Sequence, residues 1–278
     1  MSVHTRTPGD LTISPRDRAY GQVTTPKRWW LREDPIATAV LNAFSATFPQ
    51  GERFFIESVV QFKDRTSEPL TSQIRGFVRQ EAMHTREHLA FNRQVVEAGY
   101  DIAPLEARTA ERLAIARARH PIAQLALTVA MEHFTAVLAN ALLSEPAHLA
   151  GAPEAERQLW RWHSVEEIEH KSVAFDTYVA ATAGLTPYRR WSIRCKIMAL
   201  TTVMFTRTMS RNIADLLTQD GLDPRRERGM TLKHLFGRGG LLRGALWHYL
   251  AFYRPGFHPW SLDDRSLIAE TDASLAPA

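Results

Sequence analysis

The chain has 278 residues, of which 45% are hydrophobic, and its 34 Lys and Arg against 30 Asp and Glu give a net charge of +4. This length supports one large domain, or a domain with an extension, and can bury a hydrophobic core without disulfide bonds. The single cysteine, Cys195, excludes an internal disulfide and is typical of a reducing cytoplasm. No secretory signal and no apolar run of about eighteen residues is visible, so we expect a cytoplasmic protein without a membrane span.

The first predicted segment is a flexible arm, residues 1–33, which is polar and shows no periodicity. A helical bundle is predicted for residues 34–186, because apolar residues recur there at helical spacing between glycine and proline stop signals. Its helices are expected at residues 36–47, 52–63, 68–98, 105–119, 121–144 and 154–183. No strand-like alternation of any length occurs, so the sequence predicts an all-α fold.

The second of these helices carries an informative pattern. Pro49 and Gly51 are interpreted as the break that precedes it. Its periodicity directs Glu52 towards the interior, on the face that carries Phe55, and directs Glu57 towards solvent. A carboxylate on the apolar face of a helix requires a partner.

The C-terminal third forms a predicted basic helical extension, residues 187–260, with thirteen Lys and Arg against four Asp and Glu. Helices are expected at residues 188–219 and 241–252, with a charged turn at 220–229 and a loose tail at 261–278. The basic excess is interpreted first as a solvated helical face. An anionic membrane surface or an acidic partner is the alternative, and the absence of a recognised binding motif argues against nucleic acid.

Two Glu-x-x-His motifs point to metal binding: Glu81 with His84, and Glu167 with His170. On an α-helix, residues i and i+3 lie about 60° apart and one turn along the same face. An imidazole and a carboxylate so placed can bind one cation without backbone strain. Two such helices that face each other can build a dinuclear metal site inside a bundle.

Each half of the chain adds one lone glutamate, Glu52 before the first motif and Glu132 before the second. Each lone glutamate precedes its motif by about the number of residues needed for the rest of its helix, a turn and the way back along the next helix. Antiparallel helices would therefore bring all four glutamates to one level of the bundle. Glu132 lies in an almost wholly apolar helix, where an unpaired carboxylate would cost several kcal/mol. Two divalent cations would neutralise four carboxylates. The alternative is that these residues are surface charges.

Further histidines and acids border the same faces. His163 is favoured as an additional ligand, and His88 is left open between a metal ligand and a group that hydrogen-bonds a ligand. His133 lies about 100° from Glu132 and is expected to be a core residue. Glu87 and Glu166 are held in reserve as bridging or outer groups.

The donor types favour iron. Carboxylate-rich sites with one or two imidazoles per metal and no thiolate suit iron or manganese, whereas zinc prefers more nitrogen or sulfur. Two iron ions are therefore expected, with manganese or zinc as alternatives.

The order Glu, Glu-x-x-His, Glu, Glu-x-x-His resembles the ferritin-like di-iron carboxylate proteins, which include the ribonucleotide reductase small subunit, acyl carrier protein desaturases and rubrerythrins. The histidine four residues before the last motif glutamate also resembles the arylamine N-oxygenases, in which an extra histidine ligates one iron. The resemblance implies a ferritin-like antiparallel helical bundle with additional C-terminal helices. It also implies a ligand set: Glu52, Glu81, His84, Glu132, His163, Glu167 and His170.

Several phrases, in order, look like a bacterial family described as predicted metal-dependent hydrolases. They are FPQGERFF (48–55), QEAMHTREHLAFN (80–92), LTVAMEHFTAVLA (127–139), WRWHSVEEIEHKSVAFDTY (160–178) and YRPGFHPW (253–260). The similarity spans nearly the whole chain from about residue 30.

The leading functional hypothesis is an O₂-dependent di-iron oxygenase or oxidase acting on an unknown small organic substrate, with the four glutamates as catalytic groups. The alternative is a metal-dependent hydrolase in which a dinuclear centre activates water. Iron storage is disfavoured because the chain exceeds a minimal bundle. No nicotinamide or flavin fingerprint is visible, so a separate electron-donor protein is expected, and a homodimer is left open.

Overall fold

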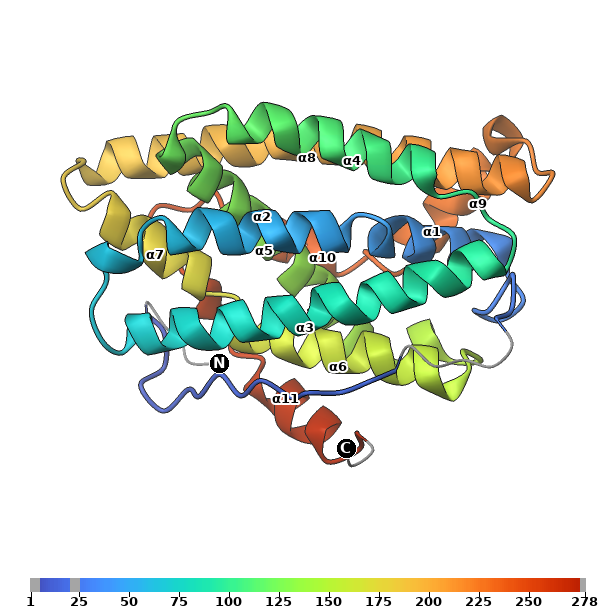
Figure 1. Ribbon diagram of the computed structural model, residues 1–278, viewed down its shortest axis with the longest axis horizontal. Helices are drawn as coiled ribbons and strands as arrows, with labels where there is room; N and C mark the ends of the chain where they lie inside the picture. Colours follow the sequence, from blue (N-terminus) through green and yellow to red (C-terminus); the bar gives the residue numbers. More distant parts are fainter. Residues whose placement is uncertain (1–5, 21–25, 276–278) are drawn as a thin grey trace.

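The structure is a computed structural model that describes residues 6–20 and 26–275 (Figure 1). These residues form α-helices and short 3₁₀ turns and include no β-strand, which confirms the all-α fold. At the centre, antiparallel pairs of helices pack into a bundle, with long helices above it and short C-terminal helices around it. The central helices are α2 (Phe48–Val60), α3 (Leu70–Glu97), α5 (Pro121–Ser144) and α6 (Glu154–His170).

The chain enters the bundle through α1 (Pro35–Ser45), whose first N–H groups are capped by the Asp34 carboxylate. The predicted break at Pro49 is wrong, because Pro49 lies in the first turn of α2. A proline fits there because the N–H groups of a first turn have no partner within the helix. Glu52 is buried, as predicted, and Glu57 is exposed and pairs with Arg117.

Helix α3 has 28 residues and ends just before Gly99, whose φ of 95° makes it the predicted C-terminal stop. Helix α4 (Ala103–Arg117) then crosses the outside of the bundle and leads to α5. Among the described helices, only α5 is long and apolar enough to cross a membrane, but 61% of its apolar window is buried by its neighbours. The core helix of a folded bundle passes the same test, so its hydropathy is weak evidence for a membrane span.

The helix predicted for residues 154–183 is interrupted directly after His170. It consists of α6 and the shorter α7 (Val173–Ala181). At the interruption, the Lys171 ammonium contacts Asp264, and the Trp260 indole donates a hydrogen bond to Ser172. The C-terminal segment therefore holds the side chains of Lys171 and Ser172 at the interruption between α6 and α7.

The C-terminal segment begins with the 33-residue helix α8 (Pro187–Gln219). Part of the expected charged turn belongs to helix α9 (Pro224–Phe236), because Asp223 accepts a hydrogen bond from the first turn and caps it. Helix α10 (Ala245–Ala251) follows. In the expected loose tail, α11 (Arg265–Asp272) packs against α6. The division into arm, bundle, extension and tail stays a prediction.

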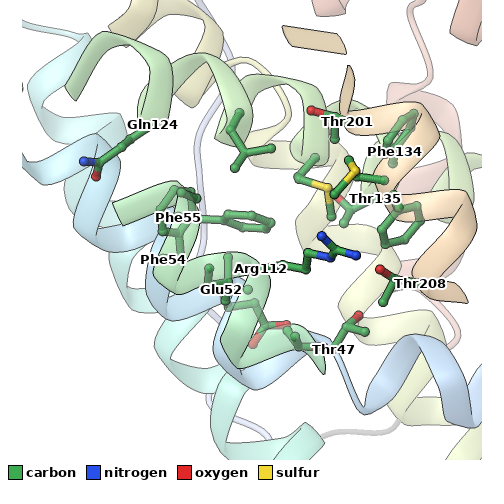
Figure 2. A pocket seen from close by; sticks show the side chains of 18 of the residues that line it. Thr47, Glu52, Phe54, Phe55, Arg112, Gln124, Phe134, Thr135, Thr201 and Thr208 are labelled. Atoms are coloured by element: carbon green, nitrogen blue, oxygen red, sulfur yellow. The ribbon is translucent and has the colours of Figure 1, made fainter. Parts of the chain in front are cut away.

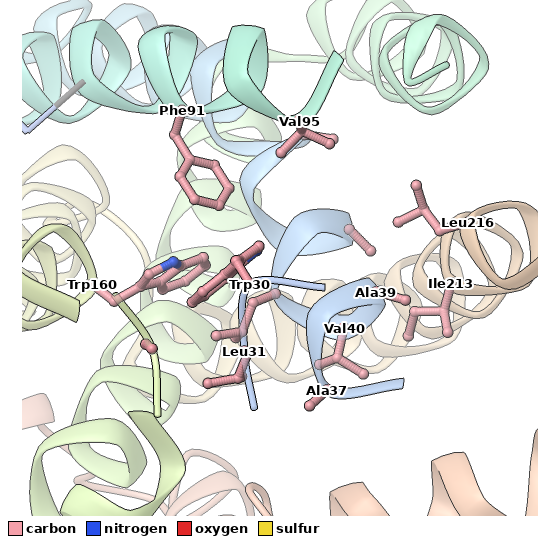
Figure 3. Close-up of a cluster of buried hydrophobic side chains, with 14 of the residues drawn as sticks. Trp30, Leu31, Ala37, Ala39, Val40, Phe91, Val95, Trp160, Ile213 and Leu216 are labelled. Carbon is pink, nitrogen blue, oxygen red and sulfur yellow. The ribbon is translucent and has the colours of Figure 1, made fainter. Parts of the chain in front are cut away.

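One end of the bundle contains a large apolar cluster (Figure 3). Trp30, which precedes α1, packs edge-on against Phe91 of α3 and lies near Trp160 of α6. Ile213 and Leu216 bring α8 into the same cluster. This packing fixes α3 and α6 relative to each other, close to the predicted metal site.

Candidate metal centre

The structure brings together all seven side chains that the sequence suggests as metal ligands. Glu52 comes from α2, Glu132 from α5, and the others from α3 and α6. None of the seven exposes more than 4% of its surface. Buried charge of this density requires neutralisation by protons or by cations.

These side chains form three groups, and the ligand atoms within each group lie within 4.8 Å of one another. Two of the groups have no residue in common. The third group contains one residue from each of them, together with Glu167. This arrangement matches two neighbouring cation sites with carboxylates between them. The groups are Glu52, His84 and His163; Glu81, Glu132 and His170; and Glu81, His84 and Glu167.

Most inward-facing atoms of this cluster lack hydrogen-bond partners in the part of the chain that the structure describes. His170 Nε2 and Glu81 Oε1 face each other at 3.1 Å, a distance that needs a proton on the imidazole or a cation beside the pair. A buried polar atom without a partner costs about 1–3 kcal/mol, so such atoms are rare in folded proteins. Here they converge on one place, where a shared cation would satisfy them all. They are both oxygens of Glu81 and of Glu132, Oε1 of Glu52, Oε2 of Glu167, Nδ1 of His84 and Nε2 of His170.

The outer nitrogens of two histidines are held by hydrogen bonds that fix their tautomers. His84 Nε2 lies 3.0 Å from the Glu166 carboxylate, so it carries the proton, and the Nδ1 lone pair faces the cluster. His170 Nδ1 donates to the side-chain oxygen of Gln80 at 3.0 Å, and the side-chain nitrogen of Gln80 donates to Glu169. Outer carboxylates that orient histidines in this way are typical of metal sites.

The N-terminal segment closes this outer layer. The backbone N–H of Arg16 donates to Glu166 at 2.7 Å, and the Arg16 guanidinium binds both oxygens of Glu169 at 2.6 and 3.0 Å. The guanidinium also pairs with Asp272 of α11 at 2.6 Å. Arg16 therefore links the two ends of the chain to the hydrogen bonds that orient His84 and His170.

A second chain of hydrogen bonds orients His163. The Ser45 hydroxyl donates to Asn92, so its oxygen accepts from His88 Nδ1 at 2.8 Å. His88 Nε2 then accepts from His163 Nδ1 at 2.7 Å. Both nitrogens of His88 are occupied, so it has no lone pair for a metal, and of the two alternatives for His88 the geometry favours an orienting role.

This relay leaves His163 Nε2 as a lone pair that lies 2.9 Å from a Glu167 oxygen. Two lone pairs at that distance repel each other unless a proton or a cation lies beside them. The same Glu167 oxygen is 3.5 Å from His84 Nδ1 and 3.5 Å from His170 Nε2. Glu167 is therefore the central carboxylate of the cluster.

The pKa shifts follow from this crowding. Burial raises the pKa of Glu52 and Glu132 well above the usual range, and the neighbouring Glu81 carboxylate raises both further. Burial also acts to raise the pKa of Glu167, but His170, His163 and His84 outweigh it and lower this pKa well below the usual value. Burial acts to lower the pKa of His84 and His170, but the neighbouring carboxylates outweigh it and raise both, that of His84 to about 10. Without cations, the cluster would therefore need protons on Glu52 and Glu132 and on these two histidines.

Other residues singled out in the sequence lie elsewhere. His133 packs against Phe252 and Phe257, its Nε2 lies 3.0 Å from the His248 carbonyl oxygen, and burial lowers its pKa to about 3. Glu87 accepts a hydrogen bond from the Tyr20 backbone N–H.

The sequence interpretation missed three groups of the outer layer: Gln80, Glu169 and Arg16. Gln80 and Glu169 each immediately precede a predicted ligand, which is a signal that adjacency could have supplied. Arg16 had no such signal, because it lies in a segment without periodicity.

A cavity of about 630 Å³ adjoins the cluster, between α2, α4, α5 and α8 (Figure 2). Among the described residues that line it, Glu52 is the only carboxylate. Phenylalanine, leucine, isoleucine and methionine side chains form most of the remaining wall. A cavity of this size suits a small organic ligand, and Glu52 is the group through which such a ligand would meet the cluster.

A family model described as predicted metal-dependent hydrolase matches residues 14–263 of the chain. The match covers the predicted ligands, the outer hydrogen-bonding groups and the cavity walls. No curated protein and no solved structure matches the chain.

Proposed function

Since the chain belongs to the family described as predicted metal-dependent hydrolases, we propose that it is a hydrolase that activates water at a dinuclear metal centre. The observation that carries this proposal is the convergence of unpartnered carboxylate oxygens and imidazole nitrogens on one buried place. Hydrogen bonds among the described residues leave these atoms unsatisfied, and two divalent cations would satisfy them.

In this proposal, Glu52, His84 and His163 would hold one cation, and Glu81, Glu132 and His170 would hold the other; Glu167 belongs to the group that links the two. Two bound divalent cations would polarise a carbonyl or phosphoryl oxygen and lower the pKa of a shared water to near neutrality. Four carboxylates balance the charge of two divalent cations, and neutral imidazoles add no charge.

The residues of the chain would supply orientation and a dry site. Thr85 donates a 2.8 Å hydrogen bond to Glu52 Oε2, which leaves Oε1 free at the edge of the cavity. Glu52 Oε1 is therefore the oxygen through which Glu52 would hold a cation at the edge of the cavity. The apolar cavity would hold the organic part of the substrate and exclude bulk solvent.

The test combines metal analysis with anaerobic hydrolysis of a panel of carboxylic and phosphoric esters after loading with zinc or manganese. We expect two metals per chain and ester hydrolysis in the absence of O₂. Glu132→Ala and His170→Ala should lose metal and activity, whereas Glu57→Gln, on the exposed face of α2, should retain both. Two metals retained in both site variants would refute the ligand assignment.

A second candidate is a di-iron oxidoreductase, with the ferritin-like relationship that the sequence suggests. It is supported by the donor set, four carboxylates with imidazoles and no sulfur, which suits iron. In this case the substrate would be oxidised by O₂, and a separate electron-donor protein would be needed. The two functions separate when the diferrous protein is mixed with air: O₂ consumption with a transient visible absorption band, and no anaerobic ester hydrolysis, would favour the oxidoreductase.

A further inference from the structure

The cavity beside Glu52 has a wall that offers few polar contacts to a ligand. Five threonines line it, and four of them donate their hydroxyl protons to backbone carbonyls of their own helices or caps. A hydroxyl engaged in this way presents mainly its methyl group to the cavity. The four are Thr47, Thr109, Thr135 and Thr201.

The amide of Gln124, another polar side chain in the wall, is also occupied. Its nitrogen donates to the carbonyl oxygens of Arg117 and Arg119 at 3.0 and 2.8 Å, and its oxygen accepts from Gln61. A polar substrate would therefore give up hydrogen bonds to water and find almost none along this wall. An alkyl or acyl chain makes no such bonds and gains free energy by leaving water.

Besides the fifth threonine, Thr208, two arginines on the α4 side of the cavity are the exception. Arg112 and Arg119 both line it and are exposed; Arg112 lies on α4, and Arg119 lies just beyond the C-terminal end of this helix. Among the described residues, neither guanidinium has a hydrogen-bond, ion-pair or aromatic partner. In contrast, Arg108 and Arg117 on the same helix pair with Asp215 and with a glutamate of α2.

We propose that the cavity binds an amphiphile with a single alkyl or acyl chain and an anionic head group, with the chain inside and the head group at Arg112 and Arg119. A guanidinium binds a carboxylate or phosphate through charge-assisted hydrogen bonds. The volume of about 630 Å³ lies within the range of small-molecule pockets. That such a ligand is also a substrate rests on the proposed function and requires an ester bond in the part of the chain that reaches Glu52.

The test uses the full-length, metal-free protein and a polyene fatty acid whose fluorescence increases in apolar surroundings. Saturated fatty acids of increasing length, and the alcohols with the same chains, are then used as competitors. We expect affinity to increase about fourfold per methylene until the cavity is full. The double variant Arg112→Gln/Arg119→Gln should weaken fatty-acid binding about ten- to a hundredfold and leave alcohol binding unchanged.

Two controls separate the head-group contacts from the chain contacts. Arg117→Gln removes an exposed arginine of the same helix that pairs outside the cavity, and it should bind the fatty acid like the wild type. Ala123→Trp fills part of the cavity and should weaken the binding of fatty acid and alcohol alike. A cooperative thermal unfolding transition is the check that this variant is folded. Affinity independent of chain length, or a double variant that binds the fatty acid normally, would overturn the proposal. Fatty-acid binding without ester hydrolysis would contradict only the proposed function.

Discussion

Replacing Glu132 by leucine should have opposite effects on stability with and without metal. Glu132 lies in the middle of α5, exposes 1% of its surface, and has no described hydrogen-bond partner for either oxygen. Leucine is similar in volume and has no polar atom to satisfy. The substitution should therefore stabilise the metal-free protein and remove the additional stability that metal binding confers.

The magnitude follows from the cost of a buried polar group without a partner, about 1–3 kcal/mol. For a chain of 278 residues, an unfolding entropy of about 2.1 cal/mol/K per residue gives about 0.6 kcal/mol per kelvin. Metal-free Glu132→Leu should then unfold about 2–5 °C above the wild type. Metal at a hundred times its Kd adds about 2.7 kcal/mol per site to the wild type, which exceeds this gain when both sites fill.

The assay is calorimetric unfolding of wild type and variant, each after chelation and after metal loading. Glu132→Gln is the matched control, because it removes the charge of a ligand but keeps a buried polar group that needs hydrogen bonds. The metal-free form of this variant should therefore gain little stability. A metal-free Glu132→Leu protein that unfolds below the wild type would contradict the interpretation of Glu132 as an unsatisfied group. An equal response of variant and wild type to metal would contradict its role as a ligand.

Three further predictions concern the rest of the molecule. Chelation should lower the Tm of the wild type by about 5 °C if one site empties and about 9 °C if two do, and an unchanged Tm in calorimetry would argue against a structural role of the metals. Arg16→Ala should weaken metal binding about ten- to a hundredfold in competition with a chromophoric chelator. Arg265→Ala, which removes a partly buried arginine of α11 that pairs with Asp10 and Asp263, should not. The protein should co-sediment with anionic vesicles at low salt, through the exposed Trp247 and the basic excess of residues 187–260. Trp247→Ala should weaken this co-sedimentation, and equal co-sedimentation with zwitterionic vesicles would exclude an electrostatic contribution.

Helical periodicity predicted well which side chains face the interior of the bundle, because it depends only on residues within one or two turns of each other. It directed Glu52 inward and Glu57 outward, and the structure agrees for both. The Glu-x-x-His spacing brought Glu81 and His84 to one face for the same reason. Each of these inferences needs only the geometry of one helix and the preference of apolar side chains for the interior.

The outer layer could not be predicted in this way, since its contacts join residues that are far apart in the chain. Arg16 reaches Glu169 across about 150 residues, and no local pattern records that distance. The interruption of the helix after His170 likewise coincides with contacts from Trp260. The role of His88 depended on knowing that Ser45 donates to another residue, which only the folded arrangement of α1 and α3 reveals.

The metal centre and the cavity meet at one side chain, and this has a consequence for how they would act together. Glu52 shares a ligand group with His84 and His163 and also lines the cavity. Thr85 holds one of its oxygens, so the other must serve both the cluster and any ligand that enters. A chain that fills the cavity would remove water from Glu52 Oε1 and strengthen its interaction with a cation. Ligand binding and metal binding should therefore favour each other through Glu52, and by thermodynamic reciprocity the factor must be the same in both directions.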